Sequence, residues 1–194
     1  MLAYVFWHWS APNTIPSTYE DHLRAFHRAL AQNPSQGFIG SAAFRIEGAL
    51  WLPQMSAYED WYLVNDFGAL GTLNEAAVSG ARKNPHDDAA RMSAGGTAGL
   101  YRPVLGEPEF PSARFAVWVA KPSNISYDQF FDDARLWLHG KSAVLWQRQM
   151  TLGPTSEFCL QSAERITVPQ RFAPVAVELT LVTAAGQPHR RAQE

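Results

Sequence analysis

Apolar side chains follow two different periods along the first part of the chain, and the change of period marks the predicted elements. Leu2–Trp9 and Gly37–Ile46 are rich in aromatic and β-branched residues, which is typical of strands. Both faces of Leu2–Trp9 are largely apolar, so we expect this strand to be covered on both sides. Between the two strands, Ser17 and Glu20 predict a capping box at the start of a helix. The apolar stripe of that helix repeats at helical spacing: Tyr19, Leu23, Phe26 and Leu30.

A second strand and helix follow after a loop. Trp61–Val64 predicts a strand, and Asp66 is a suitable N-cap for a helix that runs to Gly80, its expected C-cap. Asn84, which precedes a proline, predicts the start of a further short helix. Ser93–Ala98 is rich in glycine and small residues, so we expect a flexible turn there before the next strand.

A strand at Gly99–Leu105 completes the order β-α-β-β-α-β, which is the ferredoxin-like split unit. The second part of the chain begins in the same way. Arg114–Lys121 predicts a strand that is apolar on both faces. Ser126 then opens a helix in which Tyr127 takes the place that Tyr19 has in the first helix. The chain therefore contains an internal repeat.

The helix that would complete the second unit is missing. Thr167–Pro174 holds two prolines in eight residues and cannot form it. We predict an α+β fold built from a tandem ferredoxin-like β-α-β-β-α-β repeat, with antiparallel sheets, the helices outside and one helix absent from the second repeat. The expected divisions are a first repeat at 1–106, a second, degenerate repeat at 107–183 and a flexible tail at 184–194.

A β-α-β-β-α-β unit in tandem, with strands apolar on both faces, resembles the dimeric α+β barrel superfamily. The resemblance covers most of the chain and is one of fold pattern, without a family-specific catalytic motif. It implies that two sheets face each other and leave the helices outside. The superfamily includes antibiotic-biosynthesis-type monooxygenases, muconolactone-isomerase-like enzymes and haem proteins, so the fold alone does not define a function.

The haem proteins that the chain resembles use a histidine of the second repeat as ligand. His139 is the only histidine there before the tail. It lies at an expected helix end, where a histidine more often complements the helix dipole. We therefore predict no cofactor and regard haem bound through His139 as the least favoured hypothesis.

Composition and charge narrow the class of protein by exclusion. A hydrophobic fraction of 46% and seven tryptophans are sufficient for a large core. The net charge of −2 and a pI near 6.3 give no electrostatic footprint for nucleic acid, and no segment has the roughly 20 apolar residues of a membrane span. The single Cys159 excludes an internal disulfide and any multi-cysteine metal site. We expect a soluble cytoplasmic protein that binds neither nucleic acid nor membranes.

Polar side chains at a few positions are candidates for a functional site. Asn74 falls in the middle of an apolar helix face, where it either ties down a neighbouring segment or contacts a ligand. Arg82, His86 and the acidic residues that follow form the densest cluster of titratable groups, which is either a solvated turn or part of a site. His22 and His27 lie on opposite flanks of the first helix without the i, i+4 spacing of a metal pair, so we interpret them as boundary residues.

Two main hypotheses for the function follow. In the first, the protein binds or transforms a small apolar molecule in a cavity between the sheets, and a histidine acts as general base near neutral pH. The expected walls are Phe6, His8, Trp61, Leu63 and Tyr101, and the candidate catalytic residues are His8, His86, Asn74 and Arg82. In the second, the protein is non-catalytic, and its aromatic side chains serve the core and self-association. We expect a homodimer and no metal site.

Overall fold

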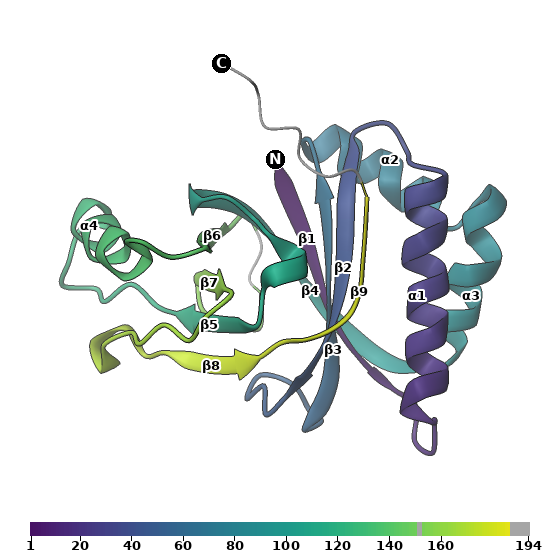
Figure 1. The fold of residues 1–194 in the computed structure, drawn as a ribbon, viewed down its shortest axis with the longest axis horizontal. Coiled ribbons are helices and arrows are strands. Elements are labelled where there is room, and N and C mark those ends of the chain that lie inside the picture. Colours follow the sequence, from purple (N-terminus) through teal and green to yellow (C-terminus); the bar gives the residue numbers. More distant parts are fainter. Residues whose placement is uncertain (151–152, 187–194) are drawn as a thin grey trace.

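The computed structural model describes residues 1–150 and 153–186, and its first half is an antiparallel sheet with helices on one face. The elements of this half are β1 (Leu2–Ser10), α1 (Pro16–Gln32), β2 (Phe38–Glu47), β3 (Ser56–Val64), α2 (Phe67–Ala77), the 3-10 helix η1 (Gly80–Arg82), α3 (Lys83–Arg91) and β4 (Ser93–Gly106). The strands lie in the order β4-β1-β3-β2, as in a ferredoxin-like unit. Helices α1, α2 and α3 all cover the same side of this sheet (Figure 1).

The second half repeats this strand arrangement with fewer helices. Its elements are the 3-10 helix η2 (Phe110–Ser112), β5 (Phe115–Val119), α4 (Tyr127–Leu138), β6 (Ala143–Arg148), β7 (Phe158–Ser162), the 3-10 helix η3 (Gln170–Phe172), β8 (Val175–Glu178) and β9 (Thr180–Gly186). The order β8-β5-β7-β6 is the order of the first half again. Only the short η3 stands where the second helix of the unit would be, which confirms the predicted loss of that helix.

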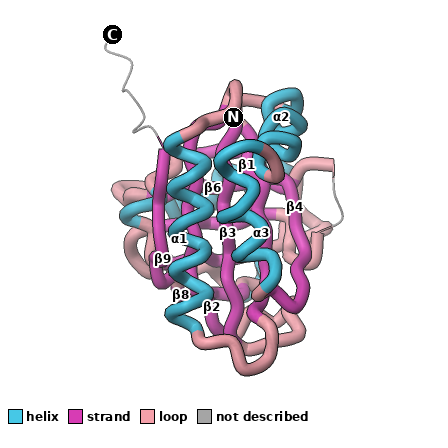
Figure 2. The backbone as a smooth tube through the Cα atoms, turned by 90° about the vertical axis from the view of Figure 1, so that its right-hand side faces the viewer, coloured by secondary structure: helices cyan, strands magenta, loops and turns pink. Residues whose placement is uncertain are grey.

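The two halves join edge to edge within one chain. β4 pairs with β6 at one junction, and β9 pairs with β2 at the other. β8 and β9 are separated only by Leu179, so this segment links the two ends of the nine-stranded sheet. Figure 1 shows this yellow path crossing from the second half to the first, and Figure 2 shows β9 beside β2 under the helices. The result is a closed α+β barrel, with all described strand pairs antiparallel.

The inside of the barrel is filled by aromatic side chains. Successive residues of a strand point to opposite faces, so β1 and β3 each send alternate residues inward. Tryptophans from both halves meet there without exposed surface: Trp7, Trp61, Trp118 and Trp146. Leu63 and Tyr101 belong to the same core cluster. The predicted location of the cavity, between the two sheets, is therefore wrong. Three of the five residues expected to line it, Trp61, Leu63 and Tyr101, are packed in this core.

Several element boundaries differ from the sequence prediction. β3 begins at Ser56, five residues earlier than expected, and α2 ends at Ala77. Gly80 has a φ of +55° and opens η1, where we expected a helix C-cap. The segment Ser93–Ala98 is the start of β4, paired with β1, and is no turn. Strand propensity gave the wrong prediction here, because glycine-rich residues can form a strand through backbone hydrogen bonds to a neighbouring strand, in this case β1.

The start of α1 and the end of the chain also need correction. Ile15 is the N-cap of α1, Pro16 opens the helix, and the expected capping box is absent. The carboxylate of Glu20 instead binds Arg24 and Arg45 at 3.0 and 3.1 Å. β9 extends to Gly186, so 184–186 are paired strand residues, and the rest of the expected tail lies outside the described residues. None of the helices within 1–150 and 153–186 is both long and apolar enough to span a membrane.

One carboxyl group is buried inside the barrel. Glu59 has no exposed surface, and its two oxygens accept hydrogen bonds from the indole nitrogens of Trp7 and Trp61, each at 2.7 Å. Burial raises the pKa of Glu59 from 4.5 to about 7, although the two indole hydrogen bonds oppose this shift. The folded protein therefore keeps a proton on Glu59 at pH values where the unfolded chain has released it.

This retained proton predicts a pH dependence of stability. The contribution of Glu59 to the free energy of unfolding should fall as the pH rises from 4.5 to 7, by on the order of 3 kcal/mol, and stay level above that window. Denaturant titrations of the wild type and Glu59→Gln across pH 4.5–8 measure it, because glutamine cannot ionise. Equal pH dependence of the two proteins would contradict the assignment.

A candidate active site between the sheet and the helices

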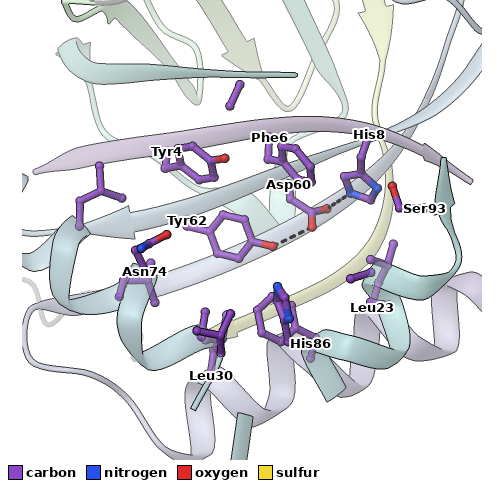
Figure 3. A pocket seen from close by; sticks show the side chains of 18 of the residues that line it. Tyr4, Phe6, His8, Leu23, Leu30, Asp60, Tyr62, Asn74, His86 and Ser93 are labelled. Atoms are coloured by element: carbon purple, nitrogen blue, oxygen red, sulfur yellow. Dashed lines mark hydrogen bonds and ion pairs between the residues drawn. The ribbon is translucent and has the colours of Figure 1, made fainter. Parts of the chain in front are cut away.

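A cavity of about 760 Å³ lies between the outer face of the first-half sheet and its helices. β1 turns Tyr4, Phe6 and His8 toward it, on the side opposite to Trp7. Figure 3 shows these side chains above the helical residues that close the other wall. The remaining lining residues include Tyr19, Leu23, Phe26, Leu30, Asp60, Tyr62, Leu70, Leu73, Asn74, Ala77, His86, Ser93, Ala98 and Leu100. Most of this surface is apolar or aromatic, as in small-molecule sites.

Asp60 is the polar centre of the cavity wall. It comes from β3, is 2% exposed, and would be costly to bury as an ion without partners. His8 places Nε2 3.2 Å from Oδ1 of Asp60, and His27 places Nε2 3.2 Å from Oδ2. The Tyr62 hydroxyl donates to Oδ2 at 2.9 Å. Partners from β1, α1 and β3 thus surround a single carboxylate, and Figure 3 shows two of them, His8 and Tyr62.

These partners determine the ionisation of Asp60. Burial alone would raise the pKa of Asp60, but the charges and hydrogen bonds of His8 and His27 outweigh it and hold the pKa below its usual range. Asp60 is therefore a carboxylate at neutral pH. Burial and the neighbouring Asp60 raise the pKa of Tyr62 well above its ordinary value, so Tyr62 stays a hydroxyl donor.

His8 connects this carboxylate to the cavity. With Asp60 beside Nε2, a neutral His8 carries its proton on Nε2 and leaves Nδ1 as an acceptor. The hydroxyl of Tyr19, which also lines the cavity, lies 2.7 Å from Nδ1. Burial raises the pKa of Tyr19, so this hydroxyl keeps its proton. The order Tyr19–His8–Asp60 is a proton-transfer arrangement in which the carboxylate stabilises an imidazolium.

Three of the four candidate catalytic residues line this same cavity. His8 comes from the sheet, Asn74 from α2 and His86 from α3. His86 places Nδ1 3.1 Å from the carboxylate of Asp87 and points into the cavity across from Tyr62 (Figure 3). Among the described residues that line the cavity there is no lysine or arginine. The site therefore offers hydrogen bonds but no fixed positive charge to a ligand.

Arg82 is placed differently from the expectation. It does not line the cavity, and its guanidinium donates to the backbone oxygens of Ala76 and Asn33. Ala76 lies in the last turn of α2, and Asn33 is the C-cap of α1. Arg82 thus connects the C-terminal ends of α1 and α2 through hydrogen bonds to their carbonyls.

The residues that hold the site together were missed from the sequence. Asp60, Tyr19 and Tyr62 were not candidates, and His27 was interpreted as a boundary residue although it has no exposed surface. The missed signal is the alternation Tyr58, Asp60, Tyr62, Val64, which places a carboxylate in a row of large side chains. His139 is the C-cap of α4, away from the cavity lining, and no metal-binding cluster occurs among the described residues.

Comparisons with known proteins support the fold. No family model matches the sequence, and no curated protein matches it. The structure is similar to a proposed monooxygenase from Fusobacterium nucleatum, at 12% identity and a TM-score of 0.60, over 96% of this chain and 94% of that one. A proposed monooxygenase from Lactobacillus acidophilus gives 7% identity and 0.60 over 96% of each chain. An anthrone oxidase-like protein gives 10% and 0.56, over 95% and 92%. At these identities the likeness shows a shared α+β barrel fold.

The role assigned to Arg82 can be tested in α2. In Arg82→Ala, the carbonyls of Ala76 and Asn33 lose the guanidinium donor, while Ala76 keeps its hydrogen bonds from Ser79, so we expect an unfolding free energy lower by about 1 kcal/mol. Backbone amides of α2 should exchange with deuterium faster, while those of β1 stay protected. Arg91→Ala removes an exposed arginine of α3 whose ion pair, within the part of the chain that the structure describes, is with Asp88 of the same helix, and serves as control. If the amides of α2 exchange at the same rate in Arg82→Ala as in the wild type, Arg82 does not stabilise the end of α2.

Proposed function

We propose that the protein is an enzyme that binds an uncharged, apolar, ring-containing molecule in the sheet–helix cavity and removes a proton from it. His8 is the base, and Tyr19 passes the proton. The observation that carries this proposal is the buried Asp60 carboxylate behind His8, at the polar side of an otherwise apolar cavity. A carboxylate in this position stabilises the imidazolium that forms when His8 accepts a proton.

The cavity favours flat apolar ligands. Its volume of about 760 Å³ is in the usual range for small-molecule sites. The rings of Tyr4 and Phe6 are nearly parallel, with an interplanar angle of 11°, and Phe6 and His8 differ by 20°. Such a row of rings suits stacking against a planar ligand. The absence of lysine and arginine among the described lining residues disfavours ligands with a carboxylate or phosphate.

The proposed proton transfer follows the chain of hydrogen bonds. The ligand gives a proton to the oxygen of Tyr19 while Tyr19 gives its own to Nδ1 of His8, so that no free phenolate forms. This concerted step suits the raised pKa of Tyr19. The resulting imidazolium lies against Asp60. Asn74 and Tyr4, at the other end of the cavity, can donate hydrogen bonds to a ligand carbonyl.

The structural neighbours favour an oxidative outcome. Two are described as proposed monooxygenases and one as anthrone oxidase-like. A methylene between aromatic rings and conjugated with a carbonyl forms a stabilised carbanion once a base removes its proton, and such a carbanion reacts with dioxygen. The balanced overall change is a CH₂ group and O₂ giving C=O and H₂O. Anthrone carries such a methylene and is a suitable probe substrate.

Substitution of the base tests the chemistry. His8→Gln should lower kcat for anthrone oxidation by about 100-fold or more, because an amide cannot accept the proton. Ligand affinity should change little, since the cavity keeps its shape. Oxygen uptake and anthraquinone absorbance measure turnover, and calorimetry with anthraquinone measures binding. His22→Gln, on α1 but outside the cavity lining, is the control. Full activity in His8→Gln would rule out His8 as the base.

Filling the cavity tests its role in binding. Ala98 lines the cavity from β4 and pairs with Phe6 across the strands. Ala98→Phe should place a ring in the ligand space and weaken anthraquinone binding by about tenfold or more, as measured by calorimetry. Leu136→Phe adds a ring at a position of α4 that is 75% exposed, and should leave binding unchanged. Equal affinities of the two variants would place the ligand elsewhere.

A further inference from the structure

His27 is a second histidine on Asp60 that the proposed chemistry does not use. It lies on α1, has no exposed surface and does not line the cavity. Its Nε2 lies as far from Oδ2 of Asp60 as Nε2 of His8 lies from Oδ1, 3.2 Å in each case. Asp60 therefore stands between two imidazoles, of which only His8 reaches the ligand.

The outer nitrogens of the two imidazoles also have matching partners. Nδ1 of His27 is 2.7 Å from the hydroxyl of Ser41, and Nδ1 of His8 is 2.7 Å from the hydroxyl of Tyr19. A hydroxyl can donate to a neutral imidazole or accept from a protonated one. The outer nitrogen of either histidine therefore keeps a hydroxyl partner when that histidine gains a proton. The ring of His27 is stacked on Tyr62 at 5.2 Å, which keeps it in place in both states.

The charge of the buried group limits how many protons it takes. With both histidines neutral, the Asp60 carboxylate leaves a net charge of −1 in the interior. One added proton makes the group neutral, and a second makes it +1 with two cations flanking one carboxylate. Charges at such short separation interact strongly away from water. The first proton is therefore bound much more readily than the second.

We propose that His8 and His27 bind one proton as a unit, shared across Asp60, and that His27 is a positioning residue that sets the protonation of His8. When the pair holds no proton, His8 is neutral and can accept one from the ligand. A proton already on His27 opposes this transfer, because it would place a second cation beside Asp60. This consequence for catalysis rests on the proposed function, whereas the sharing of the proton does not.

The other titratable groups around Asp60 do not add a competing charge. Tyr4 from β1, Tyr19 from α1, and Tyr58 and Tyr62 from β3 all have raised pKa values and stay neutral; the ring of Tyr58 is stacked on His8. His86 from α3 lines the cavity on its opposite wall and has its own partner in Asp87. The coupling between the two histidines is thus the dominant charge interaction of the site.

Histidine NMR signals test the sharing directly. In the wild type, the ring signals of His8 and His27 should both titrate in two steps with common midpoints, and their amplitudes in the first step should sum to one proton. In His27→Gln, which keeps a neutral donor to Asp60, His8 should titrate in one full step. The midpoint of this single step should lie at a higher pH than the midpoint of the complete two-step titration of His8 in the wild type. His22→Gln should leave the wild-type pattern unchanged.

Three results would overturn the proposal: independent full-amplitude titrations of the two histidines, no proton uptake by either, or no effect of His27→Gln on His8. If that variant does not fold, His8→Gln gives the reciprocal test, since His27 should then titrate in one full step. The test needs no turnover. A shared titration in a protein without oxidase activity would reject the proposed function alone, and active enzyme with uncoupled histidines would reject the sharing alone.

Discussion

The buried carboxylate of Asp60 is the constraint on which the site depends. A charge at 2% exposure persists only where donors compensate its lost hydration, and the chain supplies them from β1, α1 and β3. The same contacts fix how α1 sits on the sheet, because His27 and Tyr19 both belong to that helix. Both the packing of α1 on the sheet and the ability of His8 to accept a proton therefore depend on the side chain of Asp60. Removing Asp60 would affect both together.

The two faces of the first-half sheet have different tasks. The inner face packs tryptophans from both halves so densely that it leaves Glu59 as a buried polar group held by two indoles. The outer face keeps open space because β4 carries small residues there. Gly96 pairs with His8, and a Cβ at Gly96 would come within 2.4 Å of the ring of Phe6. The glycine-rich start of β4 thus leaves the space that the ring of Phe6 on β1 occupies.

The sequence was sufficient for the order of elements, the repeat and the missing helix, because these follow from periodicity and from proline chemistry. It was also sufficient to place His8, Asn74 and His86 as candidates, and the fold brings all three to one cavity. It was not sufficient for Asp60 or His27, whose roles depend on pairing between residues 33 positions apart. Nor could it show that Arg82 binds helix-end carbonyls, or which face of the sheet is packed, since both faces are largely apolar in sequence.

The proposed ligand binds between the sheet and the helices, with its polar group at Tyr19 and His8. A crystal structure of the protein soaked with anthraquinone tests this most directly. We predict density for one planar molecule beside Tyr4 and Phe6, with an oxygen within hydrogen-bond distance of Tyr19 or His8 and the barrel interior unchanged. A molecule bound elsewhere, or a cavity that stays empty at saturating ligand, would contradict the account.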